Sequence, residues 1–212
     1  NDGNPLPFYD PFCGSGTIPI EATLYAFNVA PGFGRRFAIE NLPIYNARRA
    51  EEIRRNEASL IRTDVEVRIT GSDIDSAAVE RSRKNAEYAC VMAGRALQSI
   101  GSDAKVPRPD FVQADFSELT APYPTGLILC NPPYGERLGD EEEAEALYRK
   151  MKCLRDEFSG WNFGVITAHK KFQENFGAYA SLLKDLKAGN LDTTLYIYRN
   201  REERGGDYRR TR

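Results

Sequence analysis

Short apolar runs alternate along the chain with longer stretches whose apolar residues recur at helical spacing. Five runs are typical of strands, at residues 7–10, 65–73, 110–116, 126–130 and 161–167. The intervening pattern predicts helices over residues 18–25, 45–60, 76–92, 141–158 and 170–183. Strands that alternate with helices predict an α/β fold around a largely parallel sheet with helices on both faces.

The end of the chain departs from this alternation. Residues 184–187 and 193–199 flank Gly189-Asn190, which is typical of an antiparallel hairpin. With the five earlier strands, the hairpin completes a seven-stranded, mostly parallel Rossmann-like sheet. We therefore expect one domain over residues 1–200, followed by a charged tail at residues 201–212 that is typical of disorder or, less often, nucleic-acid contact.

Residues 31–62 interrupt the alternation as an insertion with seven arginines against four glutamates. One interpretation is a flap beside the active site in which Arg35 and Arg36 contact phosphate. The other is a solvated helix whose Glu and Arg side chains pair at helical spacing. The second interpretation is favoured for the helix and the first for the Arg35-Arg36 loop.

Composition narrows the class of protein. The 212 residues are 41% hydrophobic and carry a net charge of −2, so no global basic field indicates nucleic acid. No apolar run approaches the roughly 20 residues that span a bilayer, and we expect a soluble, cytoplasmic protein without a membrane partner. Four dispersed cysteines and one histidine, His169, argue against a disulfide framework, a metal site and a Ser-His-Asp hydrolase.

Four successive strands end in a polar side chain, and this is the main functional signal. Asp10, Asp73 and Asp115 end the first three strands, and Asn131 follows the fourth. In an open parallel sheet, ligands bind outside the carboxyl ends of the strands. We therefore expect these four side chains to line one site.

A glycine-rich turn joins the first strand to the first helix. Gly14 and Gly16 allow a sharp turn and close approach of a ligand, and Ser15 or Thr17 can cap the helix. The turn lacks the lysine of a P-loop and the third glycine of the dinucleotide fingerprint, where Pro19 stands. A charged Asp10 would also repel a pyrophosphate and favour a hydroxyl or a cation.

The next two strand ends suit a nucleoside. One carboxylate holds two vicinal ribose hydroxyls well, so Asp73 is the candidate for a ribose, with Ile74 as an apolar wall for a purine. Asp115 can accept the exocyclic amine of an adenine, and Phe116 can pack near its ring. Asp75 is expected to be the N-cap of the following helix.

The segment after the fourth strand is the predicted catalytic loop. Asn131 offers a side-chain carbonyl oxygen and Pro132 a main-chain carbonyl, two acceptors that suit the two protons of an NH2 group. Pro133 restricts the loop, and Tyr134 adds an aromatic face on which a flat ring can lie. The alternative is an ordinary Pro-Pro turn.

Two motifs together resemble a known family. DPFCGSGT at residues 10–17 and NPPYGERLG at residues 131–139 resemble the class I S-adenosylmethionine-dependent methyltransferases that modify exocyclic amines. More narrowly, they resemble the catalytic domain of the THUMP-associated RNA guanine-N2 methyltransferases of ribosomal and transfer RNA. The likeness runs from Phe8 to about Tyr198. Asn-Pro-Pro-Tyr alone is shared with adenine-N6 DNA methyltransferases and glutamine methyltransferases of release factors.

This resemblance implies the class I methyltransferase fold, S-adenosylmethionine as cofactor and RNA as partner. It implies that the glycine turn holds the methionine part, Asp73 the ribose and Asp115 the adenine, while Asn131, Pro132, Pro133 and Tyr134 hold the target base. The implied cofactor contacts are Asp10, Phe12, Cys13, Gly14, Gly16, Thr17, Asp73, Ile74, Asp115 and Phe116. We expect no THUMP domain in this chain, and hence a need for an additional RNA-binding domain. Rival functions are DNA adenine-N6 methylation, protein glutamine methylation and RNA binding without catalysis.

Overall fold

One mixed sheet organises the chain. The computed structural model describes residues 5–33, 35–133, 141–188 and 191–200. The sheet order is β3-β2-β1-β4-β5-β7-β6, and β7 runs antiparallel to both its neighbours while the first five strands are parallel. The strands are β1 Phe8–Asp10, β2 Ile69–Asp73, β3 Asp110–Gln113, β4 Leu127–Cys130, β5 Asn162–Thr167, β6 Leu182–Ala188 and β7 Leu191–Tyr198.

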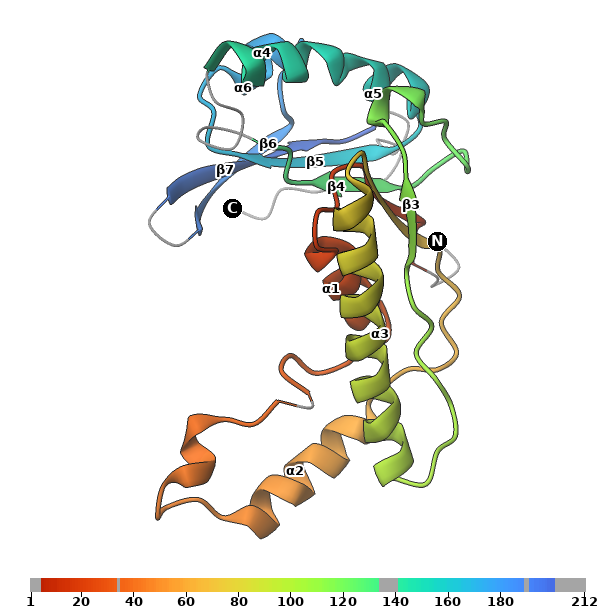
Figure 1. Cartoon of the computed structure of the whole chain (residues 1–212), viewed down its shortest axis with the longest axis vertical. Helices are drawn as coiled ribbons and strands as arrows, with labels where there is room; N and C mark the ends of the chain where they lie inside the picture. Colours follow the sequence, from red (N-terminus) through yellow and green to blue (C-terminus); the bar gives the residue numbers. More distant parts are fainter. Residues whose placement is uncertain (1–4, 34, 134–140, 189–190, 201–212) are drawn as a thin grey trace, which may run out of the picture.

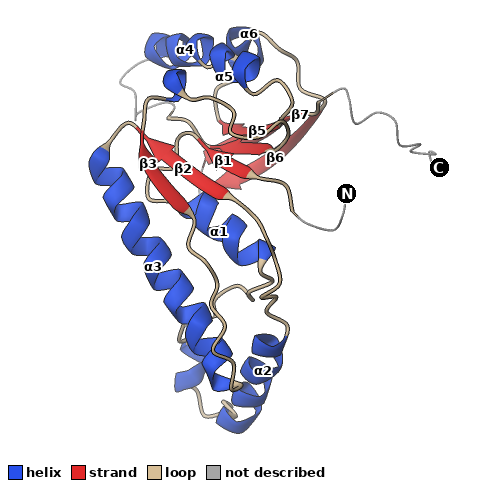
Figure 2. Ribbon diagram, turned by 90° about the vertical axis from the view of Figure 1, so that its right-hand side faces the viewer, coloured by secondary structure: helices blue, strands red, loops and turns tan. Residues whose placement is uncertain are grey.

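The predicted fold class, a Rossmann-like sheet with a C-terminal antiparallel hairpin, is therefore confirmed. Its expected turn at residues 189–190 and the tail at residues 201–212 lie outside the described residues. The helices cover both faces, with α1 and α3 on one side and α4, α5 and α6 on the other (Figures 1 and 2). They are α1 Thr17–Ala26, α2 Ala47–Ser59, α3 Ser76–Ser99, α4 Glu141–Lys150, α5 Lys152–Glu157 and α6 Phe172–Phe176, with short 3₁₀ helices η1 Ala38–Asn41 and η2 Phe116–Glu118. None of the described helices is long and apolar enough to span a membrane.

Several element boundaries differ from the sequence prediction. The helix predicted for residues 141–158 is divided near Met151, where Leu154 donates to the Met151 carbonyl three residues back and tightens the chain. The helix predicted for residues 170–183 ends at Gly177, whose φ of 72° is left-handed, and the chain then enters β6. In contrast, α3 continues to Ser99 because its later turns still bury small apolar side chains, namely Ala93, Ala96 and Leu97.

The two central strands that end at Asp10 and just before Asn131 are well buried. All three residues of β1 are buried, and Ile128 and Cys130 of β4 are fully buried. Between the sheet and helices α4 to α6, aromatic rings pack edge-on, as in the pair Phe158 and Trp161 with centroids 5.2 Å apart. This packing holds the central strands against the helices of that face.

The insertion forms an arm at the opposite end of α3 from the predicted site (Figure 1). Arg55 of α2 donates to the carbonyl of Ser99 at the C-terminus of α3, whereas Asp75 caps its N-terminus. The 24 residues of α3 separate these ends by about 36 Å. The predicted flap beside the active site is therefore wrong, because α1 runs antiparallel to the strands and delivers the insertion to the far edge.

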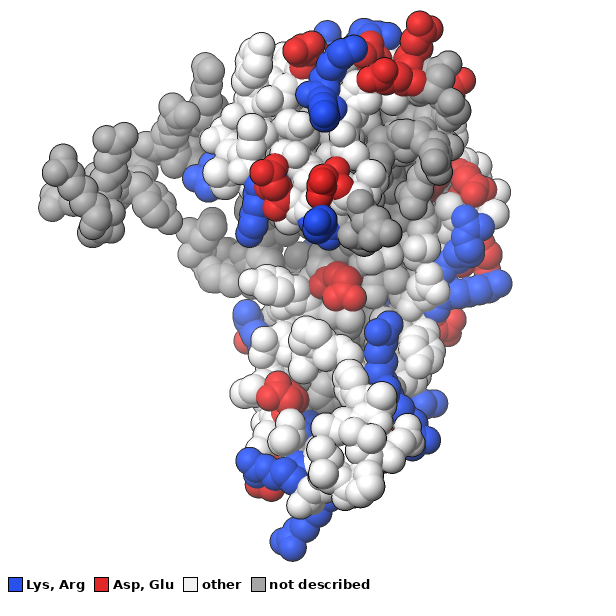
Figure 3. All heavy atoms as spheres, turned by 90° about the vertical axis from the view of Figure 1, so that its left-hand side faces the viewer, with Lys and Arg blue, Asp and Glu red and all other residues white. Residues whose placement is uncertain are grey.

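The arm instead agrees with the alternative of a solvated, internally paired helix. Glu40 pairs with Arg36 at 3.2 Å and with Arg54 at 2.8 Å, and Arg49 pairs with Glu52 at 2.8 Å. Uncharged surface bordered by Lys and Arg covers the arm at the bottom of Figure 3. Its exposed apolar side chains include Phe37, Ile39, Leu42, Ile44 and Ile53.

Candidate active site

The polar strand ends meet at the point where the strand order reverses. Strand β1 lies between β2 and β4, with Asp10 beside Gly71 of β2 and Tyr9 beside Ile128 of β4. Asp73 ends β2, and Asn131 directly follows β4. A crevice outside the carboxyl ends at such a reversal is the ligand-binding position of open α/β sheets. The structure thus brings Asp10, Asp73 and Asn131 to one edge, as predicted.

Asp73 shapes the glycine turn that faces this edge. Its Oδ2 accepts a hydrogen bond from the Gly14 amide at 2.9 Å, and its Oδ1 accepts one from the Asp75 amide at 3.0 Å. Gly14 has a φ of 54°, and a Cβ there would meet no atom within 4 Å. The turn is therefore open in front of Gly14. Asp75 caps α3 through the Ala77 amide at 2.8 Å, as predicted.

Gly16 is required for packing rather than for ligand access. Its φ is 84°, and a Cβ would come within 2.8 Å of Ser82 Cβ and 2.9 Å of Phe111 Cζ. A larger residue would push α1 away from α3 and β3. The expected side-chain cap is absent, because Gly16 itself is the N-cap and the hydroxyls of Ser15 and Thr17 face each other at 3.4 Å.

Cys13 of the turn points inward, whereas Ser15 and Thr17 are exposed. Cys13 is buried among Ile20, Val79 and Phe111, and its amide donates to the Ser72 carbonyl at 2.9 Å. Burial raises the pKa of the Cys13 thiol to about 12, so it stays protonated. Only the main chain of Cys13 can therefore contact a ligand at this edge.

Asp10 is a fully buried acid with one free oxygen. Its Oδ1 accepts a hydrogen bond from the Phe12 amide at 3.0 Å, whereas Oδ2 has no hydrogen-bond partner in the described part of the chain. Burial, and secondarily the charge of Asp73, raises the pKa of Asp10 to about 8. Burial thus favours the neutral form of the Asp10 carboxyl, which weakens the predicted repulsion of a pyrophosphate by its charge.

Asp115 lies beyond β3 as the N-cap of η2. Its carboxylate accepts from the Ser117 amide at 2.9 Å and from the Ser117 hydroxyl at 2.8 Å, and Lys150 Nζ lies 3.1 Å from Oδ2. These hydrogen bonds, the amide first, hold the pKa of Asp115 below its usual value. The ion pair between Lys150 and Asp115 was not predicted from the sequence, because the helical pattern around Lys150 does not indicate a partner 35 positions away.

The two apolar residues predicted for a purine differ in exposure. Ile74 is 68% exposed beside Asp73, so its side chain is available to a flat ring. Phe116 is buried, packs on Phe12 with ring centroids 4.9 Å apart, and has Lys150 Nζ 5.1 Å from its ring centre. Contact between Phe116 and a ligand would need Phe12 or Lys150 to move.

The Asn-Pro-Pro segment carries an unsatisfied acceptor. Asn131 Oδ1 is buried and accepts no hydrogen bond from any described residue. Pro132 is buried, and the Pro133 carbonyl accepts a hydrogen bond from the Tyr148 hydroxyl at 3.5 Å. Tyr134 lies outside the described residues. Because buried polar atoms are nearly always paired, Asn131 Oδ1 is left to accept a hydrogen bond from a donor other than the described residues.

The chain resembles known methyltransferase domains along most of its length. A sequence family described as "RMKL-like, methyltransferase domain" matches residues 3–197. YpsC of Bacillus subtilis, named as a candidate RNA methyltransferase, is 34% identical over 91% of the chain and 46% of its own length. The ribosomal RNA large subunit methyltransferase K/L of Hahella chejuensis is 33% identical over 92% of the chain and 27% of its own length. The chain thus spans half or less of these relatives.

Solved structures give the same result. SMU.472, a candidate methyltransferase crystallised with S-adenosylhomocysteine (SAH), superposes with a TM-score of 0.75 at 29% identity, over 93% of this chain and 49% of that one. A Listeria monocytogenes protein described as a predicted N6-adenine-specific DNA methylase superposes with a TM-score of 0.72 at 35% identity. That match covers 92% of this chain and 47% of the Listeria chain.

Proposed function

Because the chain belongs to the RMKL-like methyltransferase domain family, we propose that it transfers a methyl group from S-adenosylmethionine to the N2 amine of guanine in ribosomal or transfer RNA. The observation that carries the proposal is the buried, unpaired Asn131 Oδ1 at the end of β4. It lies at the edge where Asp73 holds the glycine turn. This acceptor is matched to an amine that brings its own protons.

The residues at this edge fit S-adenosylmethionine. A carboxylate has about four acceptor positions, and Asp73 uses two of them for the Gly14 and Asp75 amides, so two remain for ribose hydroxyls. Gly14 faces open space for the methionine part, and Ile74 offers an exposed apolar wall to the purine. Asp115 keeps one acceptor position on Oδ2 for the adenine amine. When bound, the cofactor supplies an electrophilic methyl group on its sulfonium centre.

The chain's own contribution to catalysis is to orient a weak nucleophile. The lone pair of an exocyclic amine is delocalised into its ring, and Asn131 Oδ1 and the Pro132 carbonyl together accept both N–H bonds. This pulls the nitrogen toward a tetrahedral geometry and frees the lone pair, so no strong general base is required before methyl transfer. The nitrogen takes the methyl group while the sulfonium sulfur leaves with the electron pair of its bond to that group, and the methylated nitrogen then releases its extra proton to water. Fixing the two reactants in line can account for about 7 to 11 kcal/mol of the barrier.

The choice of RNA is supported by the names of the relatives, YpsC and the K/L enzyme. The choice of guanine N2 depends on the sequence resemblance, whose Gly-Glu-Arg-Leu-Gly part at residues 135–139 lies outside the described residues. We further propose that RNA capture needs an additional RNA-binding domain and that the protein acts in the cytoplasm. Adenine-N6 methylation of DNA is the second candidate, favoured by the similarity to the Listeria protein.

Incubation with isotope-labelled S-adenosylmethionine tests the proposal. The wild-type chain is joined to an RNA-binding domain, as the proposal requires, and mixed with separate pools of undermethylated RNA, duplex DNA and protein, and the label in each pool is counted. We expect label in RNA, and digestion should place it on guanine. Label confined to DNA adenine would replace this proposal with the second candidate, and label in no pool despite cofactor binding would contradict both.

A further inference from the structure

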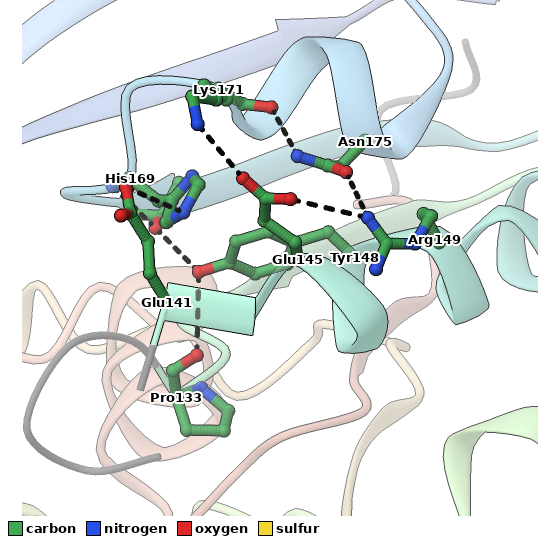
Figure 4. A network of polar contacts seen from close by, with 9 residues as sticks. Pro133, Glu141, Glu145, Tyr148, Arg149, His169, Lys171 and Asn175 are labelled. Atoms are coloured by element: carbon green, nitrogen blue, oxygen red, sulfur yellow. Dashed lines mark hydrogen bonds and ion pairs between the residues drawn. The ribbon is translucent and has the colours of Figure 1, made fainter. Parts of the chain in front are cut away.

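A pair of buried hydroxyls lies directly behind the Asn-Pro-Pro segment. Tyr148 of α4 is fully buried, and Thr167, the last residue of β5, is 1% exposed. Their oxygens are 3.0 Å apart, and the Tyr148 hydroxyl also reaches the Pro133 carbonyl at 3.5 Å (Figure 4). Helix α4 thus contacts the Asn-Pro-Pro segment through the Tyr148 hydroxyl, and strand β5 contacts that hydroxyl through Thr167.

The donors and acceptors in this group give the contacts a direction. The His169 amide donates to Thr167 Oγ1 at 3.1 Å, and the threonine hydroxyl keeps a proton that it can donate to the Tyr148 oxygen. Tyr148 has a single proton, and a carbonyl can only accept, so that proton goes to Pro133. The relay runs from the His169 amide through Thr167 and Tyr148 to the Pro133 carbonyl.

Tyr148 is itself held from two sides. Its ring packs edge-on against Phe172, with centroids 5.0 Å apart, and against His169, with centroids 5.4 Å apart. One turn before it on α4, Glu145 pairs with Lys171 at 3.3 Å, and one residue after it Arg149 donates to Asn175 at 2.8 Å. These contacts fasten α4 to the residues that follow β5, so the hydroxyl has little freedom to swing.

Among the described residues, the Asn-Pro-Pro segment has few other hydrogen bonds to hold it. Strand β4 ends at Cys130, and neither Pro132 nor Pro133 has an amide proton to donate. Asn131 Oδ1 has no partner among the described residues, so its own side chain does not anchor it through that atom. A catalytic group must nevertheless be held within about 0.5 Å of its productive position by the residues around it.

We propose that Tyr148 and Thr167 are positioning residues for the methyl transfer, fixing the Pro133 carbonyl and thereby the Asn131 and Pro132 acceptors. The inference rests on the proposed function. Burial alone does not explain the two hydroxyls, because Phe and Val would fill the same space in an aromatic core without needing partners. Neither residue is expected to touch the cofactor side, which lies across β1.

The test compares matched variants in steady-state turnover and cofactor binding. Tyr148→Phe and Thr167→Val should each lower kcat about tenfold, the range for one lost hydrogen bond, while the affinity for S-adenosylmethionine stays within about twofold. Thr167→Ser should restore most of the turnover. The Tyr148→Phe and Thr167→Val double variant should be no worse than either single one, because both interrupt one relay.

Tyr198→Phe is the control. This buried hydroxyl donates to the Ala178 carbonyl at 3.4 Å, but Tyr198 pairs with Phe163 near the start of β5, at the opposite edge of the sheet. Its loss should leave kcat unchanged even where the melting temperature falls. The positioning role would be overturned if kcat fell equally in Tyr148→Phe and Tyr198→Phe and in proportion to the fall in melting temperature. If the wild type is active and Tyr148→Phe is equally active, only the positioning role is refuted. If the wild type methylates no pool, the proposed function is refuted as well.

Discussion

The two halves of the sheet edge hold their polar groups in different ways. On the side of β1 to β3, the carboxylate of Asp73 already accepts the Gly14 amide of the neighbouring glycine turn at 2.9 Å, and that of Asp115 accepts the Ser117 amide of its own loop at 2.9 Å. On the side of β4 and β5, Asn131 Oδ1 is bare, and the loop is held from behind by Tyr148. Asp10 Oδ2 is unpaired as well, so the contrast concerns the acids that end β2 and follow β3. Under the proposed function, these acids belong to a largely preformed cofactor half, and Asn131 belongs to a target half whose acceptor is completed by substrate.

Asn131→Ala should break the target half alone, with the largest effect. Loss of one preorganised polar contact at a reacting group typically lowers kcat by about 100- to 1000-fold. Affinity for S-adenosylmethionine should remain near wild type, as measured by calorimetric titration. The control is Asn162→Ala at the start of β5, whose Oδ1 accepts from the Asn200 amide at 2.8 Å and which should keep its turnover. Wild-type turnover in Asn131→Ala would refute the role of this side chain.

Asp73→Ala should break the cofactor half. It removes two acceptors for ribose and releases the Gly14 amide, and charged hydrogen bonds of this kind are worth about 1.5 to 3 kcal/mol each. We expect cofactor affinity to fall by at least tenfold in the same titration. Asp75→Asn, which keeps an N-cap for α3, should bind as wild type. An unchanged dissociation constant for Asp73→Ala would remove the ribose assignment.

The two glycines of the turn should respond differently to alanine. Gly16→Ala creates overlaps with Ser82 and Phe111 in addition to left-handed backbone strain, and overpacking of this kind costs about 1 to 3 kcal/mol of unfolding free energy. Gly14→Ala meets open space and should cost only the backbone term, about 1 to 2 kcal/mol. Urea unfolding measures both. A larger loss in Gly14→Ala would contradict the packing role of Gly16.

The raised pKa of Asp10 should make the unfolding free energy depend on pH. Burial raises the pKa of Asp10 in the folded chain to about 8, well above the ordinary value of an aspartate, so the folded chain keeps a proton that the unfolded chain releases. Without cofactor, the unfolding free energy should therefore fall as pH rises from about 4 to about 8, by at most about 1.4 kcal/mol per pH unit. Asp10→Asn should flatten this dependence in urea unfolding series, and parallel curves for the two proteins would contradict the neutral state of Asp10.

The positions of the polar strand ends could be predicted from the sequence because they depend on local pattern. An apolar run that stops at Asp10, Asp73 or Asn131 places that residue at a strand end, and parallel strands bring such ends together. The N-cap role of Asp75 is equally local and was confirmed.

Contacts between segments that are distant in the sequence could not be predicted from local sequence pattern. The need for glycine at position 16 comes from Ser82 and Phe111, which the fold brings against it. Tyr148 follows the apolar pattern of its helix, so the sequence indicates only a core residue and not a hydroxyl directed at Pro133. The position of the arm was predicted wrongly for a similar reason. The direction of α1, which leads to the arm, depends on how the helix packs on the sheet and not on local sequence pattern.

The most direct test of the account is nucleoside analysis of total RNA from cells that lack the protein, complemented with wild type or with Asn131→Ala. We predict loss of one N2-methylguanosine in the deletion, its return with wild type and its continued absence with Asn131→Ala at equal protein level. Unchanged N2-methylguanosine in the deletion, or full recovery with Asn131→Ala, would contradict the claim that this oxygen steers a guanine amine.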